Sequence, residues 1–140
     1  MSRSSIRLLT AALALLAACG SDGFTPTEET VAGTYEATMF TVTSGVGTTD
    51  LLAIGATVDA TLAPDGTTSG RLFVPGAGEG GADLDEDLTG TWTLLGDTVT
   101  FDQTADTFIR DADFIAGRNT LTGEGTFDGV SLFLQLVKTD

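Results

Sequence analysis

Apolar and polar residues alternate with a period of two along most of the chain beyond residue 30. In the segment TVDATL, Val58, Ala60 and Leu62 fall on one side and polar residues on the other. The same alternation recurs over residues 88–95 and 130–138. Because successive side chains of a β-strand point to opposite faces, each segment has one apolar and one polar face. The pattern predicts β-strands, and no stretch beyond residue 30 has the apolar stripe of an amphipathic helix.

Short turn signals separate these segments. Pro64-Asp65-Gly66, Gly96-Asp97 and Asp128-Gly129 are suited to the positive-φ conformations that tight antiparallel turns require. We therefore predict sequential hairpins with two longer connections, at residues 44–55 and 75–87. The eight expected strands lie near residues 32–43, 56–63, 67–74, 88–95, 98–103, 107–114, 119–127 and 130–138.

Eight short strands, each joined mainly to the next, favour an all-β fold: an eight-stranded antiparallel up-and-down barrel. Closure of the barrel pairs the first and last strands, which are otherwise exposed edges. The strand at 130–138 is then expected to lie against the strand at 32–43. A two-sheet β-sandwich is the alternative, but Greek-key sandwiches need at least one long crossover, which the spacing here does not show.

The amino terminus has the pattern of a targeting segment. Arg3 and Arg7 precede an uncharged, mainly apolar run from Leu8 to Ala18. A helix needs about 20 apolar residues to cross a bilayer, so this shorter run predicts the hydrophobic region of a signal peptide. The run ends in Leu16-Ala17-Ala18-Cys19, which resembles the lipobox of bacterial lipoproteins. The alternative is an ordinary secretory signal peptide followed by a chance cysteine.

The lipobox resemblance implies a lipoprotein signal peptide at residues 1–18 that is cleaved before Cys19. It also implies that Cys19 carries a diacylglyceryl group and that the new amino terminus is acylated. Gly20, rather than aspartate, resembles the class sorted to the outer membrane. Residues 19–30 are then the lipidated cysteine and a flexible tether, and residues 31–140 the β-barrel domain. The expected location is the cell envelope, anchored by lipid to the outer membrane and facing the periplasm or the surface.

The charge of the chain and the residue types that it lacks exclude several kinds of function. The chain has 6 Lys and Arg against 20 Asp and Glu, which disfavours nucleic-acid binding because that depends on basic side chains neutralising phosphates. It has no histidine and one cysteine, which excludes a Ser-His-Asp triad, a histidine-ligated zinc and an intramolecular disulfide. We expect no cofactor and no enzymatic activity, and we expect membrane contact through the lipid anchor.

A glycine stands two residues before an aromatic residue at the start of two predicted strands. The two copies are Gly33-Thr34-Tyr35 and Gly90-Thr91-Trp92. Such a glycine lets the backbone bend while the ring plugs one end of the interior. Over about residues 31–138 the arrangement resembles lipocalin-like (calycin) domains, whose first strand carries a Gly-x-Trp/Tyr signature. The resemblance implies a barrel that binds a small apolar ligand, and it implies that Lys138 packs over the aromatic ring at the barrel base.

Trp92 is the only tryptophan and lies on the apolar face of its strand. We predict a ligand site around Trp92 that is lined by Tyr35, Phe101 and Leu94. The alternative is that Trp92 is a plug of a packed core, since side chains alone can fill an eight-stranded barrel. Glycines on the inward faces either leave room for a ligand or permit the strands to coil: Gly70, Gly90, Gly123 and Gly125.

Two further features allow two interpretations each. The carboxylates of Asp83, Asp85, Glu86 and Asp87 are of the kind that Ca²⁺ prefers, but they lack EF-hand spacing and fit a solvated acidic loop better. The strand at 130–138 is apolar on both faces, so a loop or the tether covers it, or it contacts a partner or a second copy. The two main function classes are a lipid-anchored binding barrel and a structural or protein-interaction lipoprotein with a packed interior.

Lipidation of Cys19 is directly testable. Expressed in a bacterium with labelled palmitate, the wild-type chain should incorporate the label, and Cys19→Ala should lose it because the thiol that accepts the diacylglyceryl group is absent. Autoradiography of the membrane fraction measures this. Equal label in the two proteins would exclude Cys19 as the anchor.

Overall fold

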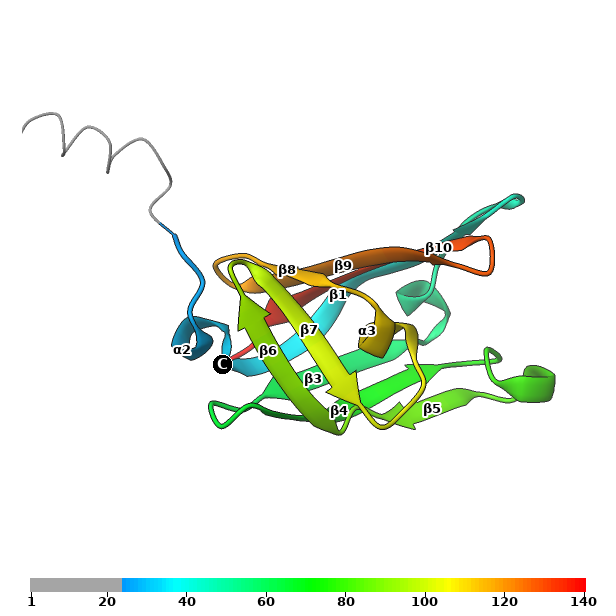
Figure 1. Ribbon diagram of the computed structural model, residues 1–140. Helices are drawn as coiled ribbons and strands as arrows, with labels where there is room; N and C mark the ends of the chain where they lie inside the picture. Colours follow the sequence, from blue (N-terminus) through cyan, green and yellow to red (C-terminus); the bar gives the residue numbers. More distant parts are fainter. Residues whose placement is uncertain (1–23) are drawn as a thin grey trace, which may run out of the picture.

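The computed structural model describes residues 24–140 (Figure 1), so the predicted signal peptide and Cys19 lie outside the described residues. The described chain is almost entirely β-structure, arranged as one sheet of ten strands with a few short helical turns. In chain order the elements are α2 (Glu28–Val31), β1 (Gly33–Ser44), β2 (Gly47–Asp50), η1 (Leu52–Ile54), β3 (Thr57–Leu62), β4 (Thr67–Val74), η2 (Glu79–Gly81), β5 (Leu84–Asp87), β6 (Gly90–Leu95), β7 (Thr98–Gln103), α3 (Phe108–Asp111), β8 (Phe114–Ala116), β9 (Thr120–Phe127) and β10 (Val130–Lys138).

The sheet closes into an antiparallel barrel of eight strands. The ring runs β1, β3, β4, β6, β7, β8, β9 and β10, and β10 returns to β1. The closing pair extends from Tyr35 opposite Lys138 to Thr43 opposite Ser131. The structure therefore confirms the predicted closed up-and-down barrel and the pairing of its first and last strands. The alternative β-sandwich does not form.

β5 and β6 are two parts of one bent strand that is longer than the predicted strand at 88–95. β6 pairs Gly90 with Thr68 of β4, and β5 pairs Asp87 with Arg71 in the same register. Residues 84–87 were expected to belong to the connection at 75–87. In this segment Leu84 and Glu86 are half-buried and the two aspartates are exposed. Because only Leu84 is apolar, the sequence does not show the alternation of apolar and polar residues that predicts a strand.

The predicted strand at 107–114 is wrong. Its first part forms the helical turn α3, and the strand β8 begins only at Phe114. The buried apolar residues of this segment are Ile109, Ala112 and Phe114. The spacing of three between the first two is helical, and only the spacing of two that follows belongs to a strand.

The predicted connection at 44–55 also contains a strand, β2, whose four residues are all exposed and so give no apolar signal.

Apolar side chains fill the middle of the barrel. Phe101 and Phe114 meet edge to face with ring centroids 5.3 Å apart. Around them lie side chains with no exposed surface, from strands on all sides of the barrel: Leu62, Leu72, Leu88, Val99, Leu121 and Leu134. Within residues 24–140, every residue of this core belongs to the segment from Val31 to Leu136.

The end of the expected tether packs on the barrel. α2 is closed by a capping box in which the Thr27 hydroxyl accepts a hydrogen bond from the backbone N–H of Thr30, 3.2 Å away. Val31 at the end of α2 is buried, and the ring of Phe24 lies 5.1 Å from the guanidinium of Arg118. The chain thus enters the barrel at the end where the carboxyl terminus also lies (Figure 1).

The closed core predicts that residues 20–140 give the circular dichroism of a β-protein and unfold cooperatively in urea without metal. In this protein, Leu88→Ala should lower the free energy of unfolding by about 2–5 kcal/mol because it opens a cavity at a fully buried site. The matched variant Leu95→Ala, at a side chain that is 85% exposed, should change it by less than about 0.5 kcal/mol. Equal effects would contradict the inward orientation of Leu88.

Candidate functional site

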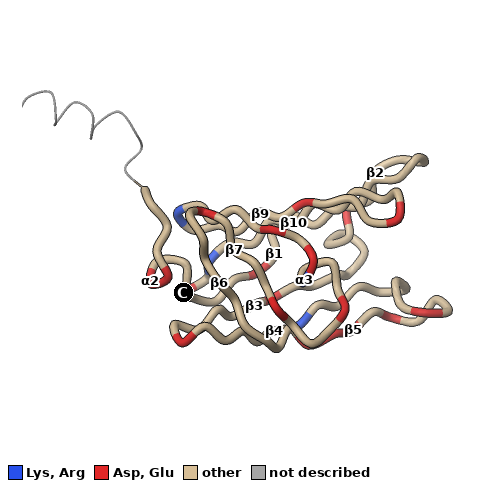
Figure 2. The backbone as a smooth tube through the Cα atoms, in the orientation of Figure 1, with Lys and Arg blue, Asp and Glu red and all other residues tan. Residues whose placement is uncertain are grey.

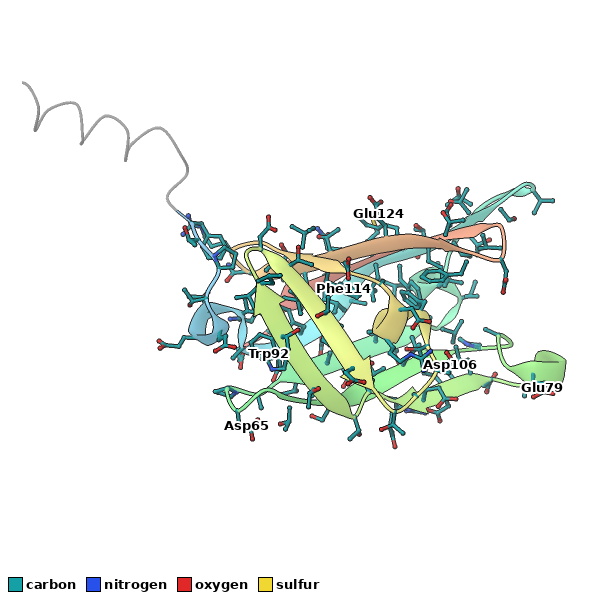
Figure 3. All side chains as sticks on the ribbon, viewed as in Figure 1. Asp65, Glu79, Trp92, Asp106, Phe114 and Glu124 are labelled. Atoms are coloured by element: carbon teal, nitrogen blue, oxygen red, sulfur yellow. The ribbon has the colours of Figure 1, made fainter. Side chains whose placement is uncertain are left out.

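Trp92, the centre of the predicted ligand site, lies at the barrel end near α2 and the β3–β4 turn (Figure 3). It is buried, and its indole Nε1–H donates a hydrogen bond to the carbonyl oxygen of Ala63, 2.9 Å away. Tyr35 and Phe101 are buried as well, and Leu94 is half-buried. None of these four residues lines any cavity described below. Their role in ligand binding stays a prediction, and their packing gives this end, the base, a solid interior.

Tyr35 ties the amino-terminal segment to the base. Its hydroxyl donates a 2.6 Å hydrogen bond to the carbonyl oxygen of Val31. Lys138 Nζ lies 5.8 Å from the centroid of the Tyr35 ring and donates to the carbonyl oxygens of Thr30 and Ala32. Lys138 therefore lies over the Tyr35 ring. Together these contacts hold α2 against the barrel.

The inward glycines leave no space for a ligand. A Cβ atom on Gly123 would lie 2.5 Å from the Phe114 ring, and one on Gly90 would lie 2.2 Å from the carbonyl oxygen of Asp102. A Cβ on Gly70 would be equally close to the backbone of β3. These glycines permit close packing of strands and rings, so the middle of the barrel is filled.

An apolar cavity, the mouth cavity, opens at the end of the barrel away from the base. It has a volume of about 220 Å³ and lies between β1 and β10 on one side and β4 and β5 on the other. The residues that line it are all apolar: Phe40, Val42, Leu51, Leu72, Val74, Ala77, Leu84, Phe108 and Leu132. Four of them, Val42, Leu84, Phe108 and Leu132, are only half-buried, so the cavity is open to solvent.

Aromatic rings form one wall of the mouth cavity. Phe108 of α3 stacks on Phe40 of β1 with centroids 5.5 Å apart and meets Phe127 of β9 edge to face at 6.4 Å. α3 thus fixes the position of Phe108 through contacts to two strands. The sequence did not indicate this site, because Phe40, Val42 and Leu132 are apolar residues within predicted strands. Phe108 also fell within a predicted strand, at 107–114.

An acidic groove lies beside the mouth cavity, along β5. It is lined by Asp85, Glu86 and Asp87 of β5 and by Thr89 and residues 104–106. β5 pairs only with β4, so its other edge is open along this groove.

The carboxylates that were considered for a cation are in part occupied. Arg71 binds Asp85 through two hydrogen bonds of 2.6 and 2.7 Å, which hold the pKa of Asp85 below its ordinary value. Asp83 accepts a hydrogen bond from the backbone N–H of Gly76. Within residues 24–140, no group of three or more acidic or cysteine side chains is placed to hold a metal ion. These contacts favour solvated and ion-paired carboxylates over a metal site, and three of the four lie on the strand β5 rather than on a loop.

No family model matches the sequence, and no curated protein is similar enough to it to count as a relative. Within the described residues, no helix is long and apolar enough to cross a membrane.

The burial of Tyr35 at the base predicts how the free energy of unfolding changes at alkaline pH. Burial, and then the charge of Asp140, raise the pKa of Tyr35 to about 12 from its ordinary value of 10. Because the unfolded chain ionises near pH 10 while the folded barrel keeps the phenol neutral, the contribution of Tyr35 to stability is complete below about pH 10 and is lost as the pH rises toward 12. Urea unfolding of residues 20–140 should therefore show a free energy of unfolding that falls over this range.

Tyr35→Phe is the control for this prediction. It should be about 1 kcal/mol less stable at neutral pH, since the bond to Val31 is lost, but its stability should fall less between pH 10 and 12. Tyr35 is the only tyrosine, so ultraviolet titration of the phenolate measures its pKa directly. An apparent pKa near 10 in the folded protein would contradict the burial of the hydroxyl.

Proposed function

We propose that this protein is a lipid-anchored lipoprotein of the bacterial cell envelope, at the outer membrane, whose barrel binds a small apolar ligand in the mouth cavity. The observation that carries the proposal is a solvent-accessible cavity lined only by apolar side chains at one end of a barrel that is otherwise filled. Exposed apolar surface of this kind costs free energy in water, and a bound ligand recovers it at about 25 cal/mol per Å².

The path of the chain is compatible with an anchor at Cys19. Phe24 and α2 pack at the base, and the mouth lies at the opposite end (Figure 1). The five residue steps from Cys19 to Phe24 span at most about 17 Å when extended. Lipidation of Cys19 would therefore hold the base near the membrane surface and leave the mouth pointing away from it, toward ligands in the aqueous compartment.

A structural or protein-interaction lipoprotein is the second candidate. The observation that favours it is the outer face of β10, where Phe133 and Val137 are half-buried rather than covered. This face offers a partner some apolar surface without any ligand in the barrel.

Titration of residues 20–140 with 1-octanol, followed by calorimetry and by amide chemical shifts, tests the binding function. We expect saturable binding with shifts centred on residues of the mouth cavity. Leu84→Trp should weaken binding at least tenfold because the larger ring fills the half-open cavity. Leu95→Trp, at an exposed site in β6, should bind as the wild type does.

Urea unfolding of both tryptophan variants shows whether they are folded. Absence of saturable binding by the wild-type barrel would exclude the ligand-binding function and leave the structural candidate. Equal weakening by the two substitutions would exclude the mouth cavity as the site.

A further inference from the structure

The mouth cavity and the acidic groove share two walls. Leu84 of β5 lines the cavity, and the next three residues of β5 line the groove. Similarly, Phe108 lines the cavity and residues 104–106 line the groove. A molecule with its apolar part in the cavity therefore has the acidic groove within reach of its polar end.

The charge on this side of the barrel is unbalanced. Four carboxylates line the groove, those of Asp85, Glu86, Asp87 and Asp106. Two of the four described basic residues, Arg71 and Arg110, lie near it, and both are already bound to carboxylates: Arg71 to Asp85, and Arg110 to Asp106 and Asp111. Figure 2 shows the acidic residues along β5 and the loops at the mouth end, while Lys138 lies at the base. An anionic head group would meet carboxylates here, and a cationic one would meet complementary charge.

Glu86 is the carboxylate best placed for such a head group. It is half-buried, shares the inner face of β5 with Leu84, and pairs in register with Leu72, and both of these leucines line the mouth cavity. Its side chain makes no hydrogen bond or ion pair with any described residue. An ammonium group beside Glu86 would give this carboxylate the charged hydrogen-bond partner that it lacks.

We propose that the ligand of this barrel is a cationic amphiphile, with a short alkyl or aryl body in the mouth cavity and a primary ammonium head beside Glu86 in the acidic groove. This proposal rests on the binding function proposed above and specifies the chemical class of the ligand. A cavity of about 150 Å³ accepts a benzene ring, so the 220 Å³ of the mouth cavity fits a ring or a chain of about eight carbons.

Three probes that share one eight-carbon chain test the proposal: octylammonium, 1-octanol and octanoate. Titrated into residues 20–140 at pH 7 and low salt, octylammonium should bind at least tenfold more tightly than octanoate, with 1-octanol between them. The difference should shrink in high salt because ions screen the groove.

Two glutamate-to-glutamine variants then locate the head group. Glu86→Gln should reduce the preference for octylammonium over octanoate at least threefold. Glu124→Gln removes one charge from an exposed site on the outer face of β9 (Figure 3) and should leave the preference unchanged. Urea unfolding of both variants establishes that they are folded.

The possible results separate this inference from the binding function. If 1-octanol binds but octylammonium has no advantage over octanoate, the cationic ligand is excluded and the apolar binding function stands. If 1-octanol does not bind, the binding function itself fails, and this inference with it. If Glu124→Gln lowers the preference as much as Glu86→Gln does, the preference comes from overall charge and the assignment to Glu86 is overturned.

Discussion

The pairing of β1 with β10 is the interaction on which the rest of this structure depends. It turns an open meander into a ring and so satisfies the backbone groups of both terminal strands. β10 remains paired with β1 from Tyr35 to Thr43, whereas the other edge of β1 changes partner, from β3 over Gly33–Glu36 to β2 over Thr41–Ser44. Where β1 leaves β3, the wall of the barrel divides. The mouth cavity is lined by Phe40 and Val42, in the part of β1 that follows its pairing with β3, so the same long strand both closes the barrel and forms one wall of the candidate site.

How much could be predicted depended on how strongly local sequence determined each element. Alternation and turn residues were sufficient for the hairpins β3–β4, β6–β7 and β9–β10, because each has one clear apolar face and a glycine-containing turn. They were insufficient for β5, where the inner face presents Glu86, and for α3, where one turn of helix follows no periodic run. Both failures concern the elements that border the mouth cavity and the acidic groove.

The candidate site could not have been located from sequence for a related reason. A residue such as Val42 or Leu132 has the same apolar identity whether it meets another side chain or an empty space. Which of these occurs is decided by the lengths of strands that are distant in sequence, and by whether α3 brings Phe108 across the opening. The aromatic residues that stand out in the sequence, Tyr35 and Trp92, instead occupy the base, where their polar atoms find backbone carbonyl partners.

The docking of α2 on the base has a mechanical consequence. The chain passes from α2 directly into β1, which runs away from the base between β10 and β3. A force applied at the amino terminus would first meet the contact of Phe24 with Arg118 and then the Lys138 contacts to the carbonyl oxygens of Thr30 and Ala32. It would then pull β1 along its own axis, so that the hydrogen bonds on both of its edges bear the load together instead of opening one after another. A barrel attached in this way resists being pulled out by shear, which is the direction in which paired strands are strongest.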